Sequence, residues 1–178
     1  MVMQTLNPTN GEIIKTFDAW SEQQIDQTLE AVSQASPAWA ALGFKDRAAL
    51  LRKAGDVLRN KRDDYAAVIT EEMGKPIVEG RAEIEKCASA CDYYADNGEA
   101  FLADEVLQSD AGKSYVAYLP LGTVLAVMPW NFPFWQVFRF AAPGLMAGNT
   151  GVLKHASNVP QCALAIEDVF RQAGEYQD

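Results

Sequence analysis

The sequence is poor in the residues that build disulfide frameworks and metal centres, with three cysteines and one histidine among 178 residues. Cys87 and Cys91 lie four residues apart, a spacing that puts two small apolar side chains on one face of a helix. A zinc site needs more ligands than these thiols and His155 supply. We therefore expect no metal site, and buried free thiols in a reducing compartment, the cytoplasm.

Dense clusters of basic residues are also absent. The chain has 15 Lys and Arg against 24 Asp and Glu, which gives a net charge of −9. Binding to nucleic acid depends on neutralising several phosphates at once, so we expect no nucleic-acid partner. Residues 1–10 are polar and lack the apolar core of a signal peptide.

One stretch without a charged residue, residues 115–138, is long enough to cross a bilayer. Pro120, Pro129 and Pro133 interrupt it. In hydrocarbon, the backbone groups that these breaks release would have no partners. We therefore expect a buried strand, a loop and the start of a helix, and no membrane segment.

The first half of the chain is predicted to be a helical layer after a short edge strand at residues 12–17. The helices are expected from apolar residues at helical spacing and from capping signals, beginning with the capping box Ser21-Glu-Gln-Gln24. The predicted helices are one from Ser21 that Ser36-Pro37 ends, one at residues 45–62, one capped by Asp63 or Asp64 that ends near Gly74, and one from Pro76 to about Phe101. This half has no obvious reactive groups, so we interpret it as packing surface.

The second half changes to an alternation of strands and helices. Residues 114–119 predict a strand, and the apolar run at residues 123–128 predicts a parallel strand buried on both faces. A helix at residues 134–147, which Pro143 should kink or stop early, a strand at residues 150–154 and a helix at residues 160–173 follow. This βαβα order is the unit from which doubly wound nucleotide-binding sheets are built.

The predicted fold class is α/β, with three parts. Residues 1–112 form a helical N-terminal layer of the cofactor domain, and residues 113–121 form a strand of the kind used in oligomer contacts. Residues 122–178 form the first βαβα unit of an incomplete Rossmann-like cofactor-binding domain. A doubly wound sheet normally has about five or six strands, so we expect the chain to be truncated.

The candidate site is Met128-Pro129-Trp130-Asn131-Phe132-Pro133, at the carboxyl end of the first parallel strand, where open α/β sheets bind ligands. Two prolines restrict the backbone on either side of a polar amide. An immobile Asn131 amide could donate a hydrogen bond to a developing oxyanion. The alternative is a rigid turn in which Asn131 caps the next helix.

Several motifs, in order along the chain, resemble the aldehyde dehydrogenase superfamily. They are Asn7-Pro-Thr-Asn-Gly11, Glu71-Glu-Met-Gly-Lys-Pro76, Pro120-Leu-Gly-Thr-Val124, Pro129-Trp-Asn-Phe-Pro133, Ala147-Gly-Asn-Thr150 and Val152-Leu-Lys154. The resemblance implies an NAD- or NADP-dependent enzyme that oxidises a small-molecule aldehyde to an acid, as a homo-oligomer when complete.

The resemblance also implies roles for individual residues. The side-chain amide of Asn131 would help to hold the thiohemiacetal oxyanion, while Met128, Pro129 and Trp130 would line the cofactor cleft. Lys154 would hydrogen-bond the adenosine ribose, although a lysine at a strand end can also be merely solvated.

Two positions depart from the family pattern, in which Lys-Pro-Ala-Glu or Lys-Pro-Ser-Glu is common. His155 replaces the proline, and we interpret it as incidental rather than catalytic. Ser157 stands where NAD-preferring members often carry a glutamate against the ribose hydroxyls. We assign Ser157 to the cofactor site and expect NADP to be accepted.

Arg139 follows Asn131 by eight residues, within an apolar segment where a charged side chain is costly to bury. It could reach solvent, pair with a structural carboxylate, or hold a substrate carboxylate with its planar guanidinium. Succinate-semialdehyde dehydrogenases carry an arginine at this offset, so the chain resembles that branch. The resemblance then implies succinate semialdehyde as the substrate and Arg139 as its ligand.

The nucleophilic cysteine and the general base of the family lie beyond residue 178 in its members. None of Cys87, Cys91 and Cys162 stands in the nucleophile's motif. We therefore expect the isolated chain to be inactive. The alternatives are a non-catalytic module that binds a nucleotide or assembles subunits, and a remnant without activity.

Overall fold

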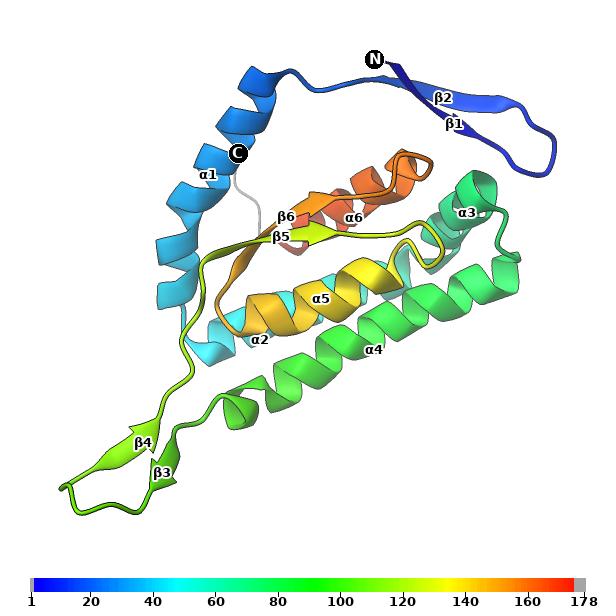
Figure 1. The fold of residues 1–178 in the computed structure, drawn as a ribbon. Coiled ribbons are helices and arrows are strands. Elements are labelled where there is room, and N and C mark those ends of the chain that lie inside the picture. Colours follow the sequence, from blue (N-terminus) through cyan, green and yellow to red (C-terminus); the bar gives the residue numbers. More distant parts are fainter. Residues whose placement is uncertain (1, 175–178) are drawn as a thin grey trace.

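The computed structural model describes residues 2–174, and Figure 1 shows its arrangement. The elements in chain order are β1 (Val2–Leu6), β2 (Ile13–Asp18), α1 (Glu22–Ala41), α2 (Phe44–Asn60), α3 (Arg62–Met73), α4 (Ile77–Phe101), β3 (Glu105–Leu107), β4 (Ser114–Val116), β5 (Thr123–Val127), α5 (Trp135–Met146), β6 (Thr150–Lys154) and α6 (Pro160–Ala173). The α/β fold class is confirmed, because β5 and β6 pair in parallel and are joined by α5.

The helical layer forms as predicted, with two differences at its helix ends. Helix α1 does not stop at Ser36-Pro37 but continues to Ala41 with Pro37 inside it. Its last turn is held by tertiary contacts, since the indole of Trp39 donates to the carbonyl of Leu145 (3.1 Å) and Arg47 donates to the carbonyl of Ala40 (3.3 Å). These contacts outweigh the local preference against an internal proline.

The prediction that Asp63 or Asp64 caps α3 is also wrong. Lys61 occupies the cap position without a side-chain hydrogen bond, because α2 and α3 follow one another with only this residue between them. Asp63 lies in the first turn and instead accepts a hydrogen bond from Arg81 of α4 at 2.8 Å.

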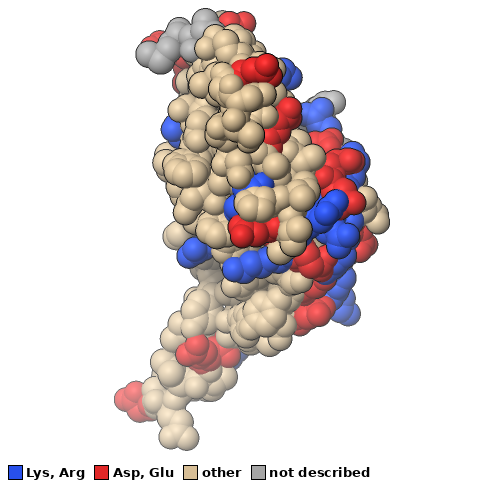
Figure 2. Space-filling model, turned by 90° about the vertical axis from the view of Figure 1, so that its right-hand side faces the viewer, with Lys and Arg blue, Asp and Glu red and all other residues tan. Residues whose placement is uncertain are grey.

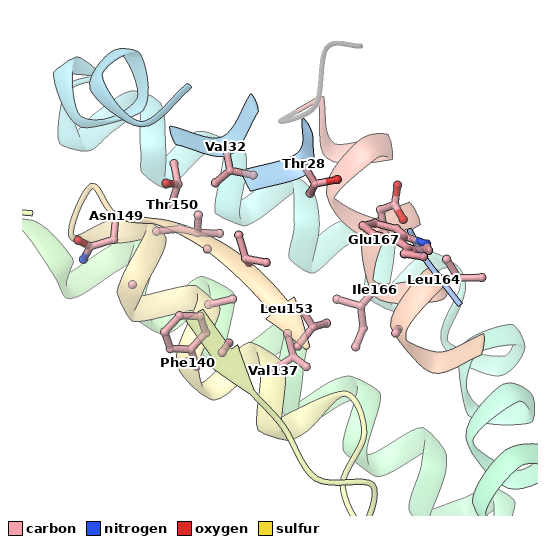
Figure 3. Close-up of a pocket in the computed structure, with 18 residues that line it drawn as sticks. Thr28, Val32, Val137, Phe140, Asn149, Thr150, Leu153, Leu164, Ile166 and Glu167 are labelled. Carbon is pink, nitrogen blue, oxygen red and sulfur yellow. The ribbon is translucent and has the colours of Figure 1, made fainter. Parts of the chain in front are cut away.

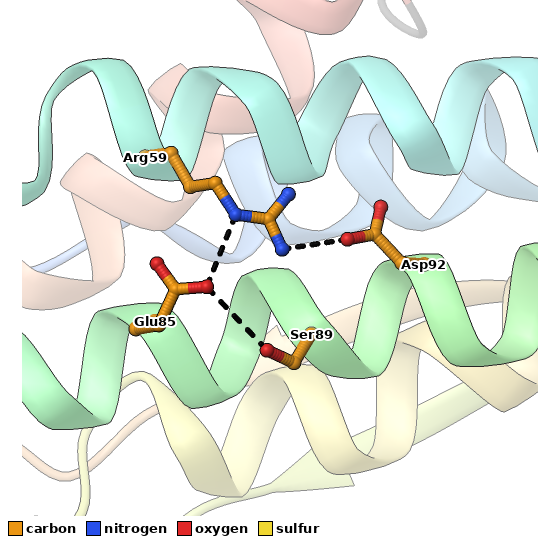
Figure 4. Close-up of polar contacts among 4 residues, drawn as sticks. All are labelled: Arg59, Glu85, Ser89 and Asp92. Carbon is orange, nitrogen blue, oxygen red and sulfur yellow. Dashed lines mark hydrogen bonds and ion pairs between the residues drawn. The ribbon is translucent and has the colours of Figure 1, made fainter.

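Helices α2 and α4 lie side by side and are joined on their partly exposed flank by Arg59 (Figure 4). The guanidinium of Arg59 donates to Glu85 at 3.1 Å and to Asp92 at 2.6 Å, and Ser89 donates to Glu85 at 3.5 Å. The hydrogen bond to Asp92 and then that to Glu85 raise the pKa of Arg59 against the effect of burial. Exposed ion pairs of this kind contribute only about 0–1 kcal/mol each.

The core lies where α5 and α6 pack against the helices α2, α3 and α4. Phe134 and Phe138 of this region are fully buried, and their rings stack at 6.5 Å between centroids. Gly98 allows α4 and α5 to approach closely, because a Cβ at this position would lie 2.3 Å from Cγ of Met146. This contact holds the last turn of α5 against α4. The start of α5 is also held against α4, through Glu83.

Strand β5 is less buried than its apolar sequence predicts. Ala126 is buried, but Leu125 and Val127 are each 64% exposed. The prediction of burial on both faces is wrong for the described chain, in which the face of β5 that carries Leu125 and Val127 is left uncovered. Helix α5 passes through Pro143 without stopping and ends at Met146.

Two antiparallel hairpins extend from the helical body (Figure 1). Strand β4 is shorter than the predicted segment 114–119 and pairs with β3, which the sequence did not predict. Strand β1 was also missed, and it pairs with β2.

Among the described residues, no helix is both long and apolar enough to traverse a bilayer. Within the same residues, His, Cys, Asp and Glu side chains do not gather in groups of three or more that would suit a metal ion. On the face seen in Figure 2, blue and red side chains are mixed over the helical body.

Candidate active-site loop at the carboxyl ends of the parallel strands

The two parallel strands deliver their following loops to the same edge of the sheet. Val127 of β5 is opposite Lys154 of β6, and the N–H of Met128 donates to the carbonyl of Lys154 at 3.1 Å. The loop that contains Asn131 and the loop that contains Ser157 therefore start side by side. The predicted site residues of the two strand ends are brought together at one edge.

The loop that contains Asn131 is held in place by a buried ion pair between Lys75 and Glu83. The carboxylate of Glu83, on α4, accepts hydrogen bonds from the backbone N–H groups of Phe134 (2.9 Å) and Trp135 (3.0 Å). Its other oxygen contacts the ammonium group of Lys75, and the Lys75 and Glu83 side chains are only 6% and 1% exposed. The same ammonium lies 3.8 Å from the ring centre of Phe132.

The second loop is fixed in the same manner by Glu72 of α3, which is 3% exposed. Its two carboxylate oxygens accept the backbone N–H groups of Gln161 and Cys162, each at 2.8 Å. These N–H groups belong to the first turn of α6, where an α-helix leaves its donors without internal partners.

His155 joins the two loops. Its Nδ1 accepts the N–H of Ala156 at 2.8 Å, so Nε2 carries the proton and donates to the carbonyl of Pro133 at 2.9 Å. Burial is the largest effect on this imidazole and lowers its pKa, which favours the neutral form that the hydrogen bonds require. His155 is thus a structural bridge across the site.

Asn131 is exposed, and its side chain makes no hydrogen bond with any described residue. The alternative in which Asn131 caps the next helix is wrong, because α5 has no side-chain cap from its own loop and Glu83 takes that place. Trp130 and Phe132, on either side, are 49% and 45% exposed. The amide of Asn131 is therefore available to a ligand. The loop that carries it is anchored by Glu83.

Arg139 is exposed on α5, one helical turn after Trp135. It makes no ion pair with a carboxylate of residues 2–174, so pairing with a structural carboxylate is not its role within them. The neighbouring ring of Trp135 is covered instead by the ammonium group of Lys86, at 4.0 Å from the ring centre. The guanidinium of Arg139 is free to bind an anion.

Lys154 and Ser157 are both exposed at the edge of the sheet, and their side chains have no hydrogen-bond or ion-pair partner in the part of the chain that the structure describes. Lys154 is the last paired residue of β6, opposite Val127, and its carbonyl accepts the N–H of Met128, while Ser157 follows in the loop after β6. This edge therefore offers an ammonium group and a hydroxyl group without a competing carboxylate contact.

The cysteines are unsuited to nucleophilic attack. Cys87, Cys91 and Cys162 are buried, and burial raises the pKa of the Cys87 and Cys162 thiols, which disfavours the reactive thiolate. None of them lies in the loop of Asn131. Among the described residues, no cysteine lies beside the exposed amide of Asn131.

A separate apolar cavity of about 530 Å³ lies between α1, the strand pair, α5 and α6 (Figure 3). Val32, Phe140, Leu153 and Ile166 line it, and Glu167 lies at its rim. None of the predicted site residues lines this cavity. Its chemistry is that of a packing surface rather than of the candidate site.

The residues that fix the loops, Glu72, Lys75, Glu83 and His155, were missed as site residues in the sequence. Glu72 and Lys75 do lie in one of the motifs that carry the family resemblance, Glu71-Glu-Met-Gly-Lys-Pro76. For Glu72 and Lys75 that motif was the available signal, and it gave no indication of which loops their side chains would reach.

Comparison with known proteins places the chain among relatives of similar sequence and fold. Residues 1–176 match the sequence profile described as the aldehyde dehydrogenase family. The chain is 54% identical over 174 residues to a probable succinate-semialdehyde dehydrogenase (NADP(+)) of Synechocystis sp., covering 98% of this chain and 38% of that protein. It is 47% identical over 179 residues to succinate-semialdehyde dehydrogenase (NADP(+)) 1 of Mycobacterium bovis, covering 98% of this chain and 39% of that protein.

Among solved structures, the chain is similar to the succinic semialdehyde dehydrogenase of Streptococcus pyogenes in complex with NADP+. The TM-score is 0.93 at 38% identity, covering 97% of this chain and 38% of that one. The chain thus spans 38–39% of the length of these relatives.

Proposed function

The chain belongs to the aldehyde dehydrogenase family, as its motifs predicted, and from this premise we propose that it is part of an NADP-accepting enzyme that oxidises succinate semialdehyde to succinate. The observation that carries the proposal is Asn131, whose free amide stands on a loop anchored by two buried carboxylate hydrogen bonds. Relatives that are named succinate-semialdehyde dehydrogenases support the substrate.

Asn131 is the oxyanion donor in this proposal. When a nucleophile attacks an aldehyde, the carbonyl oxygen gains negative charge, and a donor already in place stabilises it without reorganisation. The anchored backbone provides that preorganisation, and the absence of an internal partner among residues 2–174 leaves both amide hydrogens available.

Arg139 is the proposed ligand of the substrate carboxylate. Its guanidinium is exposed and unpaired within the described residues, on the helix that begins directly after the Asn131 loop. A planar guanidinium can hold a carboxylate through two parallel hydrogen bonds. A four-carbon semialdehyde would place its carboxylate at Arg139 and its aldehyde at Asn131.

The edge formed by Met128, Pro129, Trp130, Lys154 and Ser157 suits a nicotinamide dinucleotide. The ammonium of Lys154 would hold the adenosine ribose or its 2′-phosphate, and Ser157 places no negative charge against that phosphate. The bound dinucleotide would accept the hydride of the aldehyde. The NADP-dependent relatives support this choice of cofactor.

The nucleophile and the general base would come from residues outside this chain, since its three cysteines are buried. We therefore propose that residues 1–178 alone are inactive. Loss of a nucleophile typically costs about 10⁴–10⁶ in rate. The buried cysteines are consistent with a reducing compartment, the cytoplasm.

We also propose that the complete enzyme is a homo-oligomer that uses the hairpin of β3 and β4. This hairpin extends away from the helical body (Figure 1) and exposes apolar side chains, among them Val106 (75%), Leu107 (52%) and Tyr115 (47%). These exposures also favour a second candidate, a subunit-assembly module without catalysis.

The test is an assay of the complete protein, with the isolated chain as control. The complete protein should reduce NADP when succinate semialdehyde is supplied, and the isolated chain should not. A complete protein that is folded and oligomeric, yet oxidises no aldehyde with NAD or NADP, would favour the assembly module.

A further inference from the structure

The backbone around Asn131 is fixed by side chains that lie far from it in the sequence. The start of α5 has no local cap, and its N–H groups at Phe134 and Trp135 are satisfied by Glu83 of α4. A carboxylate at a helix start also interacts favourably with the positive end of the helix dipole. The angle at which α5 leaves the loop therefore depends on Glu83.

Lys75 makes this arrangement possible in a buried place. A carboxylate that is 1% exposed is costly without a compensating charge, and the Lys75 ammonium, on a 6% exposed side chain, supplies that charge. The ammonium also lies 3.8 Å from the ring centre of Phe132, a distance at which a cation–π interaction is attractive. The pair thus contacts the chain on both sides of Pro133.

The side chain of Asn131, in contrast, makes no hydrogen bond within residues 2–174 that would hold it in place. Its position is inherited from its neighbours, of which Phe132 and Phe134 contact the ion pair. A displacement of about 1 Å at a reacting group can cost roughly 10²-fold in rate. Small structural changes at the Lys75–Glu83 pair should therefore lower the reaction rate by displacing Asn131.

We propose that Lys75 and Glu83 are positioning residues that orient the amide of Asn131 toward the oxyanion, an inference that rests on the proposed function. The pair does not touch substrate. It fixes residues 132–135, and through them the direction in which the Asn131 amide donates its hydrogen bond.

The experiment compares Glu83→Gln with Glu85→Gln in the complete enzyme. Glu85 lies on the same helix and binds Arg59 without contacting the loop, which makes it a matched control. We expect Glu83→Gln to lower kcat about 10- to 100-fold, less than or similar to loss of an oxyanion donor. The KM for semialdehyde and NADP should change less than about threefold, because the proposed binding groups Arg139 and Lys154 are untouched.

The decisive readout is the same substitution in an Asn131→Ala background. A residue that acts through Asn131 has nothing left to position there, so Glu83→Gln should cause no further loss of kcat. An equal loss in both backgrounds means that the pair is merely structural and overturns the proposal. A kcat for Glu83→Gln equal to that of Glu85→Gln also overturns it.

Lys75→Arg provides a second variant in case Glu83→Gln does not fold. It keeps the charge opposite Glu83 but replaces the compact ammonium beside Phe132 with a planar guanidinium. We expect a smaller kcat loss that again disappears in the Asn131→Ala background. A loss that persists there overturns the proposal.

Amide hydrogen exchange separates this inference from the proposed function, because it needs no turnover. Peptides covering residues 132–137 should exchange faster in Glu83→Gln than in Glu85→Gln, even if the wild-type enzyme does not oxidise succinate semialdehyde. Faster exchange in a protein without that activity supports the anchoring and rejects the substrate. Unchanged exchange overturns the anchoring itself.

Discussion

The carboxylates of Glu72 and Glu83, on the neighbouring helices α3 and α4, each accept two backbone N–H groups at the start of a helix that follows a parallel strand. Glu72 accepts hydrogen bonds from the start of α6, and Glu83 accepts them from the start of α5. The helical layer therefore packs against α5 and α6. It sets the starts of both helices of the βαβα unit, and with them the two loops of the candidate site.

The first prediction concerns the stability that Glu72 provides. Glu72→Ala should lower the free energy of unfolding by about 2–4 kcal/mol, because two buried N–H groups of α6 lose a charged acceptor. Urea unfolding followed by circular dichroism measures the change. Glu71→Ala is the matched control, since Glu71 is the adjacent exposed residue of the same helix and should change stability by less than about 0.5 kcal/mol. Equal effects of the two substitutions would show that the hydrogen bonds to α6 do not stabilise the fold.

The ends of helices and strands could be predicted where neighbouring residues determine them, and not where tertiary contacts determine them. Strand β6 and helix α6 begin and end where the sequence predicts, because Gly148-Asn149 before the strand, Pro160 at the start of the helix and Gly174 after its end are local signals. The end of α1 was predicted wrongly, because the contacts that carry it past Pro37 come from other elements, Arg47 of α2 and Leu145 of α5.

The site shows the same division. The position of Asn131 at the carboxyl end of a parallel strand could be predicted, since strand order and a proline-bounded loop are sequence features. The burial of Glu72, Lys75 and Glu83 could not. A charged side chain is normally solvated, and burial becomes favourable here because α3, α4 and the segment between them pack against two helix starts.

The second prediction concerns pH and His155. Its pKa in the folded protein lies below the ordinary value of about 6.5 because it is buried. Above that value both the folded and the unfolded states are neutral at this residue, and it adds no pH dependence. As the pH falls below about 6.5, the unfolded state binds the proton first, so stability decreases until the folded pKa is reached.

The measurement is the melting temperature at pH 7.5 and pH 5.5 for the wild type and for His155→Gln. The wild type should lose more stability across this interval than the variant, which lacks the imidazole. Identical losses would mean that His155 is protonated as readily in the folded state as in the unfolded state.

The third prediction concerns cofactor preference in the complete enzyme. Ser157→Glu would place a negative charge at the edge where Lys154 is exposed, and this charge would repel a 2′-phosphate. Unit charges about 4 Å apart interact by about 1–4 kcal/mol at the effective dielectric constants of water and protein surfaces. We therefore expect the ratio of kcat/KM for NADP to that for NAD to fall tenfold or more. Ser157→Gln, of similar size without the charge, is the control, and a fall of the same size in both variants would rule out charge as the cause.

The last prediction tests the substrate through Arg139. In the complete enzyme, Arg139→Ala should raise the KM for succinate semialdehyde tenfold or more, because a charge-assisted hydrogen bond contributes about 1.5–3 kcal/mol. The KM for butanal, which has four carbons and no carboxylate, should stay within about twofold, since no charge is there to be held. Lys86→Ala, which removes the nearby cation over Trp135, is the matched control and should leave the ratio of the two KM values unchanged. If Arg139→Ala weakens both aldehydes equally, Arg139 supports the helix rather than the substrate, and succinate semialdehyde loses its main argument from this chain.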